Sequence, residues 1–306
     1  MTKRMDTLSV ENRIIELKKE LNAVILAHNY CLPEVQDIAD FVGDSLGLAI
    51  KASQTDADVI VFCGVTFMAE TAKILNPDKT VLIPEPEAYC VMAKMCTPEQ
   101  IDSLKSQHPG AEVVGYVNST AACKTRMDVC CTSSNAIKIV STTKSKDVIF
   151  VPDKNLGSYV ATKCPDKNVI LWNGFCPMHQ FITVRQVQAL KDEFPEAPVI
   201  AHPECRLEVL ALADAIGSTE KMISLSNESE SDDIIILTEI GMKHRLEKEC
   251  PGKRFHFIDS VICTAMKMTD LPSVLEVMEN ASNRVELDDG TMKAAYEPVR
   301  RMVETK

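Results

Sequence analysis

Three cysteines recur in this sequence at a nearly constant spacing. Cys90, Cys176 and Cys263 lie 86 and 87 residues apart, and each follows a short apolar run that predicts a buried strand. If three copies of one unit surround a common axis, these positions converge on one point. Three thiolates there could hold a zinc ion with an open fourth position, or a [4Fe–4S] cluster with one iron that lacks a protein ligand. Spacing leaves both open, and either would act as a Lewis acid on a substrate oxygen.

The other nine cysteines show no such recurrence. The sequence contains twelve cysteines but no Cys-x-x-Cys, so local spacing indicates no chelating motif. We therefore predict that the nine are small buried residues. Cys31, which follows His28-Asn29-Tyr30, is the strongest exception, as a thiol that could line a site.

Polar pairs follow three predicted strands at the same period, and alternation sends both members of a pair to one side of the strand. These pairs are His28 and Tyr30, Tyr116 and Asn118, and His202 and Glu204. A carboxylate beside a Lewis-acidic metal can accept a substrate proton, so Glu204 is our candidate for the general base. The alternative is that Glu204 only caps a backbone turn after Pro203.

Hydroxyl residues precede or begin three predicted helices at the same period. Ser45, Ser133 and Thr219 are spaced by 88 and 86 residues. Free backbone N–H groups at helix N-termini favour anions, so the three positions predict ligands that carry three anionic groups. Simple N-capping by each residue is the alternative, and it can coexist with ligand binding.

Strands and helices that repeat with a period of 86–89 residues must position these groups. Three apolar, β-branched runs recur in each unit: 24–28, 58–62 and 81–83; 113–116, 147–151 and 169–171; and 199–202, 233–237 and 255–258. Helices are predicted to begin near Ser9, Thr97 and Thr183, the last two with a Thr and Gln capping box. Alternating strands and helices predict an α/β fold with parallel sheets.

We therefore expect three pseudo-repeated α/β/α sandwich domains around a pseudo-threefold axis. The expected domains are 1–91, joined by the C-terminal segment 264–306, then 92–177 and 178–263. The segment 264–306 repeats the opening helix once more, which would close the ring.

Composition excludes several classes of function. Of the 306 residues, 45% are hydrophobic and 25% are charged, as in an ordinary globular enzyme. The formal net charge of −11 disfavours a nucleic-acid partner. No apolar run has the length of a membrane span, and the first twenty residues contain no apolar signal-peptide core. We predict a cytoplasmic protein with no membrane partner.

Seven segments together resemble the quinolinate synthase family of NAD biosynthesis. They are Ala27-His28-Asn29-Tyr30, Val42-Gly43-Asp44-Ser45-Leu46, residues 63–73 (CGVTFMAETAK), Tyr116-Val117-Asn118, Trp172-x-Gly174-x-Cys176-Pro177-x-His179, His202-Pro203-Glu204-Cys205 and Gly217-Ser218-Thr219. The resemblance implies a triangular three-domain fold and a [4Fe–4S] cluster on Cys90, Cys176 and Cys263. It also implies condensation of iminoaspartate with dihydroxyacetone phosphate to quinolinate, phosphate and water.

The resemblance further implies roles for individual residues. Glu204 would be catalytic, and Tyr30 and His202 would orient substrate or relay protons. The implied substrate-binding residues are His28, Ser45, Tyr116, Asn118, Ser133, His179, His202, Glu204, Ser218 and Thr219. The two carboxylates and one phosphate of the substrates agree with three anion sites, and functional coupling to the enzyme that supplies iminoaspartate is expected. The competing hypotheses are another iron–sulfur hydro-lyase acting on a hydroxy acid, and an iron–sulfur sensor without catalysis.

Overall fold

The computed structural model describes residues 7–305 and contains three four-stranded parallel sheets. The strand orders are β2-β1-β3-β4, β6-β5-β7-β8 and β10-β9-β11-β12. Their bounds in chain order are β1 Ala23–His28, β2 Phe41–Gly43, β3 Val59–Cys63, β4 Thr80–Leu82, β5 Glu112–Tyr116, β6 Val129–Cys131, β7 Asp147–Val151, β8 Asn168–Leu171, β9 Val199–Ala201, β10 Ala215–Ile216, β11 Asp233–Leu237 and β12 Arg254–His256. One sheet order therefore occurs three times, as the period predicts.

The helices follow the same order in each unit. Their bounds are α1 Thr7–Glu20, α2 Pro33–Ile38, α3 Ser45–Gln54, α4 Thr66–Leu75, α5 Pro98–Gln107, α6 Ala121–Lys124, α7 Ala136–Ser141, α8 Lys154–Lys163, α9 Pro177–Gln180, α10 Val184–Glu193, α11 Leu207–Leu210, α12 Thr219–Glu228, α13 Met242–Glu249, α14 Leu271–Asn280 and α15 Asp289–Glu304. Two 3₁₀ turns, η1 Met92–Lys94 and η2 Ala265–Lys267, follow the first and third of the recurring cysteines. The capping boxes predicted at Thr97 and Thr183 are both present.

The three units share strand register as well as strand order. The central pairs at equivalent positions are Ile25 with Val61, Val113 with Ile149, and Val199 with Ile235. An aspartate that precedes each edge strand accepts a hydrogen bond from the first residue of these pairs. The donors and acceptors are Ile25 N and Asp40, Val113 N and Asp128, and Val199 N and Asp214, each at 2.8 Å. The repeat therefore extends to individual hydrogen bonds.

Alternating burial on two faces makes each unit a sandwich. In the first sheet, Ile25 and Val61 pack with residues of α1 and α14, whereas Leu26 and Ile60 pack with residues of α3 and α4. Parallel strands covered by helices on both faces need apolar residues at every position, which explains their continuous β-branched runs.

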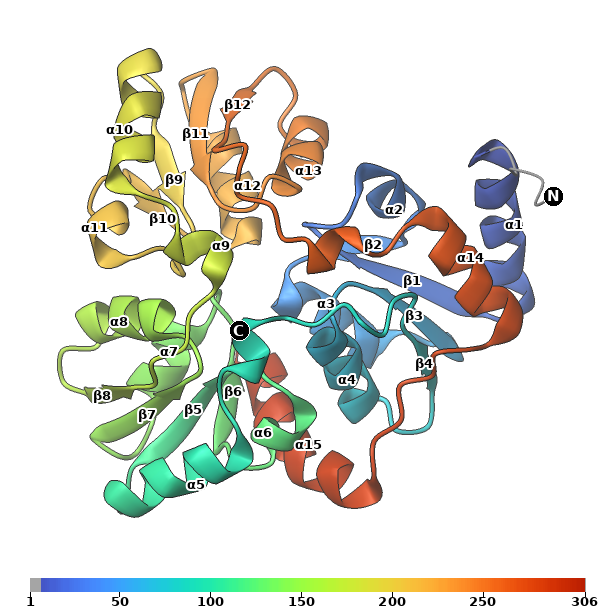
Figure 1. Cartoon of the computed structure of the whole chain (residues 1–306), viewed down its shortest axis with the longest axis horizontal. Coiled ribbons are helices and arrows are strands. Elements are labelled where there is room, and N and C mark those ends of the chain that lie inside the picture. Colours follow the sequence, from blue (N-terminus) through green and yellow to red (C-terminus); the bar gives the residue numbers. More distant parts are fainter. Residues whose placement is uncertain (1–6, 306) are drawn as a thin grey trace.

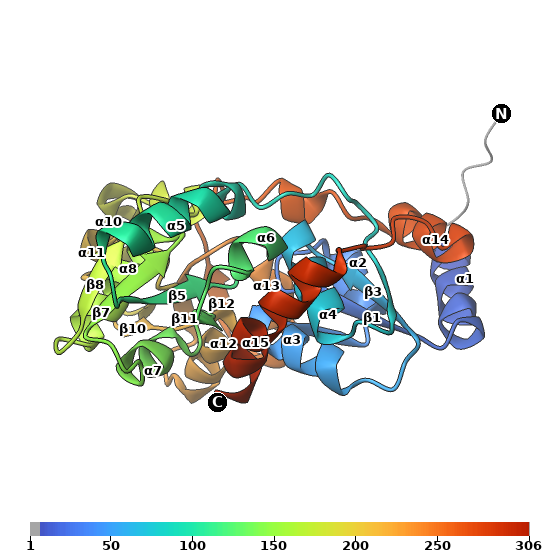
Figure 2. The same ribbon diagram turned by 90° about the horizontal axis from the view of Figure 1, so that it is seen from below.

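The C-terminal helices tie the ring together. Figure 1 shows the three units arranged in a triangle, with α14 beside α1 and α15 between the first and second units. In the perpendicular view of Figure 2, α15 crosses beside α3 and α4. Asn135 donates hydrogen bonds to the carbonyls of Met302 and Thr305, both at 3.0 Å. The last helix thus joins the first unit to the second.

A short edge strand in each unit, β2, β6 or β10, was not among the predicted strands. These strands have only two or three residues, and each contains only one β-branched residue. No helix among residues 7–305 has the length and apolar character needed to cross a bilayer.

Candidate active site and metal centre

One cavity of about 130 Å³ lies where the carboxyl ends of strands from all three sheets meet. Its walls contain every predicted site residue except Ser218 and Cys31. The predicted residues that line it are His28, Tyr30, Ser45, Cys90, Tyr116, Asn118, Ser133, Cys176, His179, His202, Glu204, Thr219 and Cys263. Residues separated by up to 235 positions in the sequence therefore line the same cavity.

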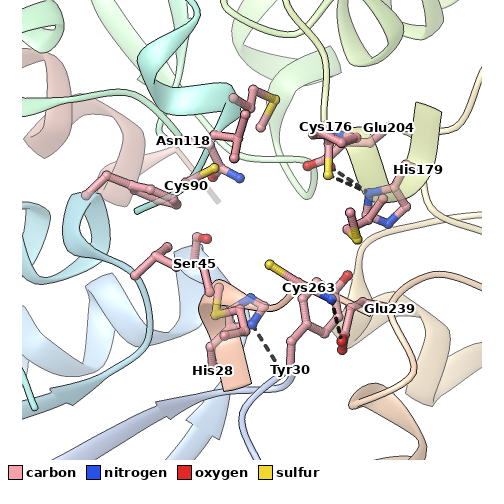
Figure 3. Close-up of a pocket in the computed structure, with 18 of the residues that line it drawn as sticks. His28, Tyr30, Ser45, Cys90, Asn118, Cys176, His179, Glu204, Glu239 and Cys263 are labelled. Atoms are coloured by element: carbon pink, nitrogen blue, oxygen red, sulfur yellow. Dashed lines mark hydrogen bonds and ion pairs between the residues drawn. The ribbon is translucent and has the colours of Figure 1, made fainter. Parts of the chain in front are cut away.

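The three cavity cysteines, Cys90, Cys176 and Cys263, come from three different units. Figure 3 shows their sulfur atoms facing the same open space. Burial raises the pKa of the Cys90 thiol to about 12 and also raises the pKa values of Cys176 and Cys263. These half-buried thiols therefore ionise only where a cation compensates their charge, and a metal centre supplies one. This donor set therefore fits a metal cofactor.

Two buried carboxylates fix the backbone at two of these cysteines. Asp153 accepts a hydrogen bond from Cys176 N at 3.2 Å, and Glu239 accepts one from Cys263 N at 3.0 Å. Burial, with the nearby Glu204 charge, raises the pKa of Asp153 to about 8. Burial also raises the pKa of Glu239 although Lys267 lies 3.0 Å away. Neither carboxylate was predicted, although they lie 86 residues apart at equivalent strand ends.

His28 and His202 present the same ring nitrogen to the backbone. The backbone N–H of Tyr30 donates to His28 Nδ1 at 3.1 Å, and that of Glu204 donates to His202 Nδ1 at 3.3 Å. An accepting Nδ1 assigns the proton of the neutral ring to Nε2. Burial lowers the pKa of both histidines to about 3, so both are neutral near pH 7. Each ring can therefore donate one hydrogen bond from Nε2.

Glu204 lies in a fully formed polar network. Its carboxylate accepts a hydrogen bond from the Tyr116 hydroxyl at 2.5 Å and lies 2.8 Å from His179 Nδ1. His179 stacks on His202 with ring centroids 4.6 Å apart. Burial opposes ionisation, but the two imidazoles and these hydrogen bonds lower the pKa of Glu204. Glu204 is thus an ionised carboxylate inside the cavity rather than a turn cap.

Tyr30 reaches the same network through Thr238. The Tyr30 hydroxyl lies 2.6 Å from Thr238 Oγ1, which is 2.9 Å from His179 Nε2. Burial and the Glu204 charge raise the pKa of Tyr30, so it remains a phenol near neutral pH. Thr238 was not predicted, since the equivalent residues in the other units are Gly64 and Pro152.

The three predicted helix N-termini differ in the structure. Ser45 and Thr219 are the first residues of α3 and α12, and both line the cavity. Ser133 also lines the cavity, but it lies in a turn before α7, whose N-cap is Asn135, so its predicted place at a helix N-terminus is wrong. Ser218 was predicted to bind substrate, but it does not line the cavity. Its side chain caps α12 by accepting from Lys221 N.

Asn118 carries an unsatisfied polar atom at the cavity wall. Its buried Oδ1 has no hydrogen-bond partner within residues 7–305. Figure 3 shows the side chain beside Cys90. A buried amide without a partner costs free energy unless a ligand satisfies it, which favours a role in binding.

The other nine cysteines are all buried, as predicted, and Cys31 does not line the cavity. None recurs in all three units, as expected, but four of them form two pairs at equivalent positions of two units. Cys31 and Cys205 donate to the carbonyls of Cys63 and Leu237, and Cys164 and Cys250 donate to those of Ile137 and Ile223. These thiols serve packing and local hydrogen bonding.

Comparison with known proteins agrees with this geometry. The family model described as quinolinate synthetase A protein matches residues 12–304. A protein named quinolinate synthase from Aquifex aeolicus is 48% identical over 96% of this chain and 94% of its own length. Proteins of the same name from Dehalococcoides mccartyi and Methanoregula boonei are 50% and 49% identical, over 96% and 97% of this chain and 97% and 99% of their own lengths. The chain therefore belongs to the quinolinate synthetase A protein family, whose curated members are enzymes named quinolinate synthase.

Proposed function

We propose that this enzyme condenses iminoaspartate with dihydroxyacetone phosphate to form quinolinate, phosphate and water, using a [4Fe–4S] cluster held by the three cavity cysteines. The observation that carries the proposal is the meeting of three thiols from three units in one cavity. A cluster with one open iron supplies a Lewis acid that polarises a substrate oxygen and assists loss of a hydroxyl. The family membership supports this choice over zinc.

The helix N-termini and neutral hydrogen-bond donors of the cavity would bind the anionic groups of the substrates. The substrates carry two carboxylates and one phosphate. Ser45 and Thr219 begin helices of ten residues each, where free N–H groups and the helix dipole favour anions. The Asn118 amide nitrogen and the Nε2–H groups of His28 and His202 add neutral donors, and the unpartnered Asn118 Oδ1 can accept from a substrate N–H or O–H. Neutral donors orient anionic oxygens without adding a mobile proton.

Glu204 is the residue that would accept the substrate proton. It is ionised and only 3% exposed, and it lies next to Cys176 through their common neighbour His179. An ionised carboxylate shielded from water can accept a C–H or O–H proton from a substrate bound in the cavity. Tyr116 and His179 hold its two oxygens in place. Tyr30, coupled to His179 through Thr238, can return a proton to an oxygen that develops negative charge.

The proposed reaction also implies a source of iminoaspartate and a cellular compartment for the enzyme. Iminoaspartate would come from a functionally coupled enzyme that oxidises an amino acid to its imine. All twelve cysteines are free, which fits a reducing compartment such as the cytoplasm.

Anaerobic purification followed by iron and sulfide analysis and a quinolinate assay tests the proposal. We expect four irons and four sulfides per chain, and quinolinate only when both substrates are supplied. Binding of dihydroxyacetone phosphate separates this reaction from that of a hydro-lyase acting on a hydroxy acid. A chain that contains the cluster but neither binds the triose phosphate nor forms quinolinate would exclude the proposed reaction.

A further inference from the structure

A second set of metal-ligand atoms shares one member with the three cavity cysteines. Cys176 Sγ, a His179 ring nitrogen and a Glu204 carboxylate oxygen all lie within 4.8 Å of one another. His179 Nδ1 is 3.3 Å from the sulfur and 2.8 Å from Glu204 Oε2. We infer that the cluster-free protein binds one Zn²⁺ at Cys176, His179 and Glu204, and that this ion and the iron–sulfur cluster exclude each other.

The surroundings orient all three donors toward one point. Nε2 of His179 lies 2.9 Å from Thr238 Oγ1, so Nδ1 is the nitrogen left for a metal. A partner on the second ring nitrogen is the usual arrangement for a histidine that binds a metal. The Tyr116 hydroxyl holds Oε1 of Glu204, which leaves Oε2 toward His179. The donors are therefore positioned before any ion arrives.

The distances suit zinc after a small expansion. Tetrahedral zinc has Zn–S near 2.3 Å and Zn–N and Zn–O near 2.0–2.2 Å, so its ligand atoms lie roughly 3.3–3.6 Å apart. The short contact between His179 and Glu204 would open by about half an ångström when Zn²⁺ replaces the proton between them. Sulfur, nitrogen and oxygen are all zinc ligands, and three protein ligands leave a fourth position for water. All three residues line the cavity, so that position faces open space.

Zinc and the cluster would compete for the same cysteine. Cys176 cannot bind zinc through this set and also retain its place on the cluster. Zinc would also occupy the lone pairs of Glu204, the proposed base. Zinc that reaches the protein before the cluster is built would therefore block both assembly and catalysis at one site.

Zinc titration of the full-length, cluster-free chain under anaerobic conditions tests this inference. A chromophoric chelator reports affinity and stoichiometry, and Co²⁺ reports thiolate ligation by its absorption spectrum. We expect one Zn²⁺ per chain. His179→Ala should weaken binding at least 100-fold, and Thr238→Val, which removes the hydroxyl that His179 shares with Tyr30 but no proposed zinc ligand, should weaken it about 10-fold.

Cys90→Ser is the matched control, because it removes one cysteine of the cavity but none of the proposed zinc ligands. It should bind zinc as the wild type does, while His179→Ala should still incorporate iron on reconstitution. Added zinc should reduce iron incorporation in the wild type but not in His179→Ala. Zinc affinity lost in Cys90→Ser and kept in His179→Ala would assign the ion to the three cysteines and overturn the inference. Absence of stoichiometric zinc binding in the wild type would also overturn it.

These readouts are independent of quinolinate formation. Metal stoichiometry and Co²⁺ spectra can support the zinc site even if the proposed reaction fails. An active, cluster-containing enzyme can equally lack the zinc site.

Discussion

Replacement of Glu204 by glutamine removes one negative charge from the centre of the cavity and changes little else. Gln has nearly the same size, and both of its neighbours can adapt. The Tyr116 hydroxyl can rotate to accept from the new amide, or His179 Nδ1 can accept while Nε2–H donates to Thr238. Every polar atom therefore keeps a partner, so we expect Glu204→Gln to fold and to contain the cluster.

The expected loss lies in the rate. One general base contributes about 10²–10⁴-fold, which corresponds to roughly 2.7–5.4 kcal/mol of transition-state free energy. Glu204 is 3% exposed, so water cannot readily replace it as the base. Substrate affinity should change less, because the Asn118 amide and the helix N-termini are untouched.

Anaerobic turnover to quinolinate, normalised to iron content, measures the effect. The control is Glu208→Gln, the same chemical change four residues along the chain at an exposed carboxylate that pairs with Arg206. It should match the wild type. If Glu204→Gln contains full iron and turns over within threefold of the wild type, Glu204 is not the base, and Tyr30 becomes the candidate to replace with Phe.

Three further outcomes follow from the cavity. Serine in place of any of the three cavity cysteines should remove iron and activity. Cys130→Ser, at a buried position away from the cavity, should keep both. Iron analysis and the quinolinate assay measure the two effects. Asn118→Ala should weaken substrate binding about 10- to 150-fold, the equivalent of 1.5–3 kcal/mol for a hydrogen bond to a charged group, with iron content unchanged; unchanged affinity would leave the amide without a binding role. Burial lowers the pKa of His28 from 6.5 to about 3, so its contribution to stability is complete above pH 6.5 and is lost as pH falls toward 3. Urea unfolding between pH 6 and 4 should therefore show a slope about 1.4 kcal/mol per pH unit smaller in His28→Gln, and equal slopes would contradict a neutral buried ring.

The buried strands could be predicted because a strand covered on both faces needs an apolar residue at every position, which produces a continuous apolar run in the sequence. Their lengths and period are as expected, and so are the two capping boxes. The edge strands β2, β6 and β10 were not found by this signal, and each contains only one β-branched residue. The opposite edge strands β4, β8 and β12 were found, because the runs 81–83, 169–171 and 255–258 recur at the period. A weaker signal was present in Asp40, Asp128 and Asp214, which stand one period apart and bond the central strands. Aspartate in a loop is too common to be informative until its partner is known.

Site residues were predictable where the three units retain equivalent chemistry. The cavity cysteines and the polar pairs at the first strand ends stand at matching positions, so the period brings them together. Thr238 has no polar equivalent in the other units, and its importance arises only from contact with Tyr30 and His179. The helix predicted near Ser133 begins at residue 136, and the side chain of Asn135 bonds Thr132 N and the carbonyls of Met302 and Thr305 instead of capping that helix. Contacts of this kind with the C-terminal segment have no periodic signature.

Divergence among equivalent positions explains how a symmetric scaffold can bind asymmetric substrates. The positions after the third strands all carry cysteine, because they face the axis and meet one symmetric group of thiols. The positions after the second strands carry Val65, Asp153 and Glu239, and only the two acids hold a cysteine backbone N–H. Residues near the axis thus retain one chemistry, whereas residues farther along the strand ends can differ in charge. The ends of the first strands diverge in the same way, since the third unit carries Glu204, the base that we propose, where the first and second units carry Tyr30 and Asn118.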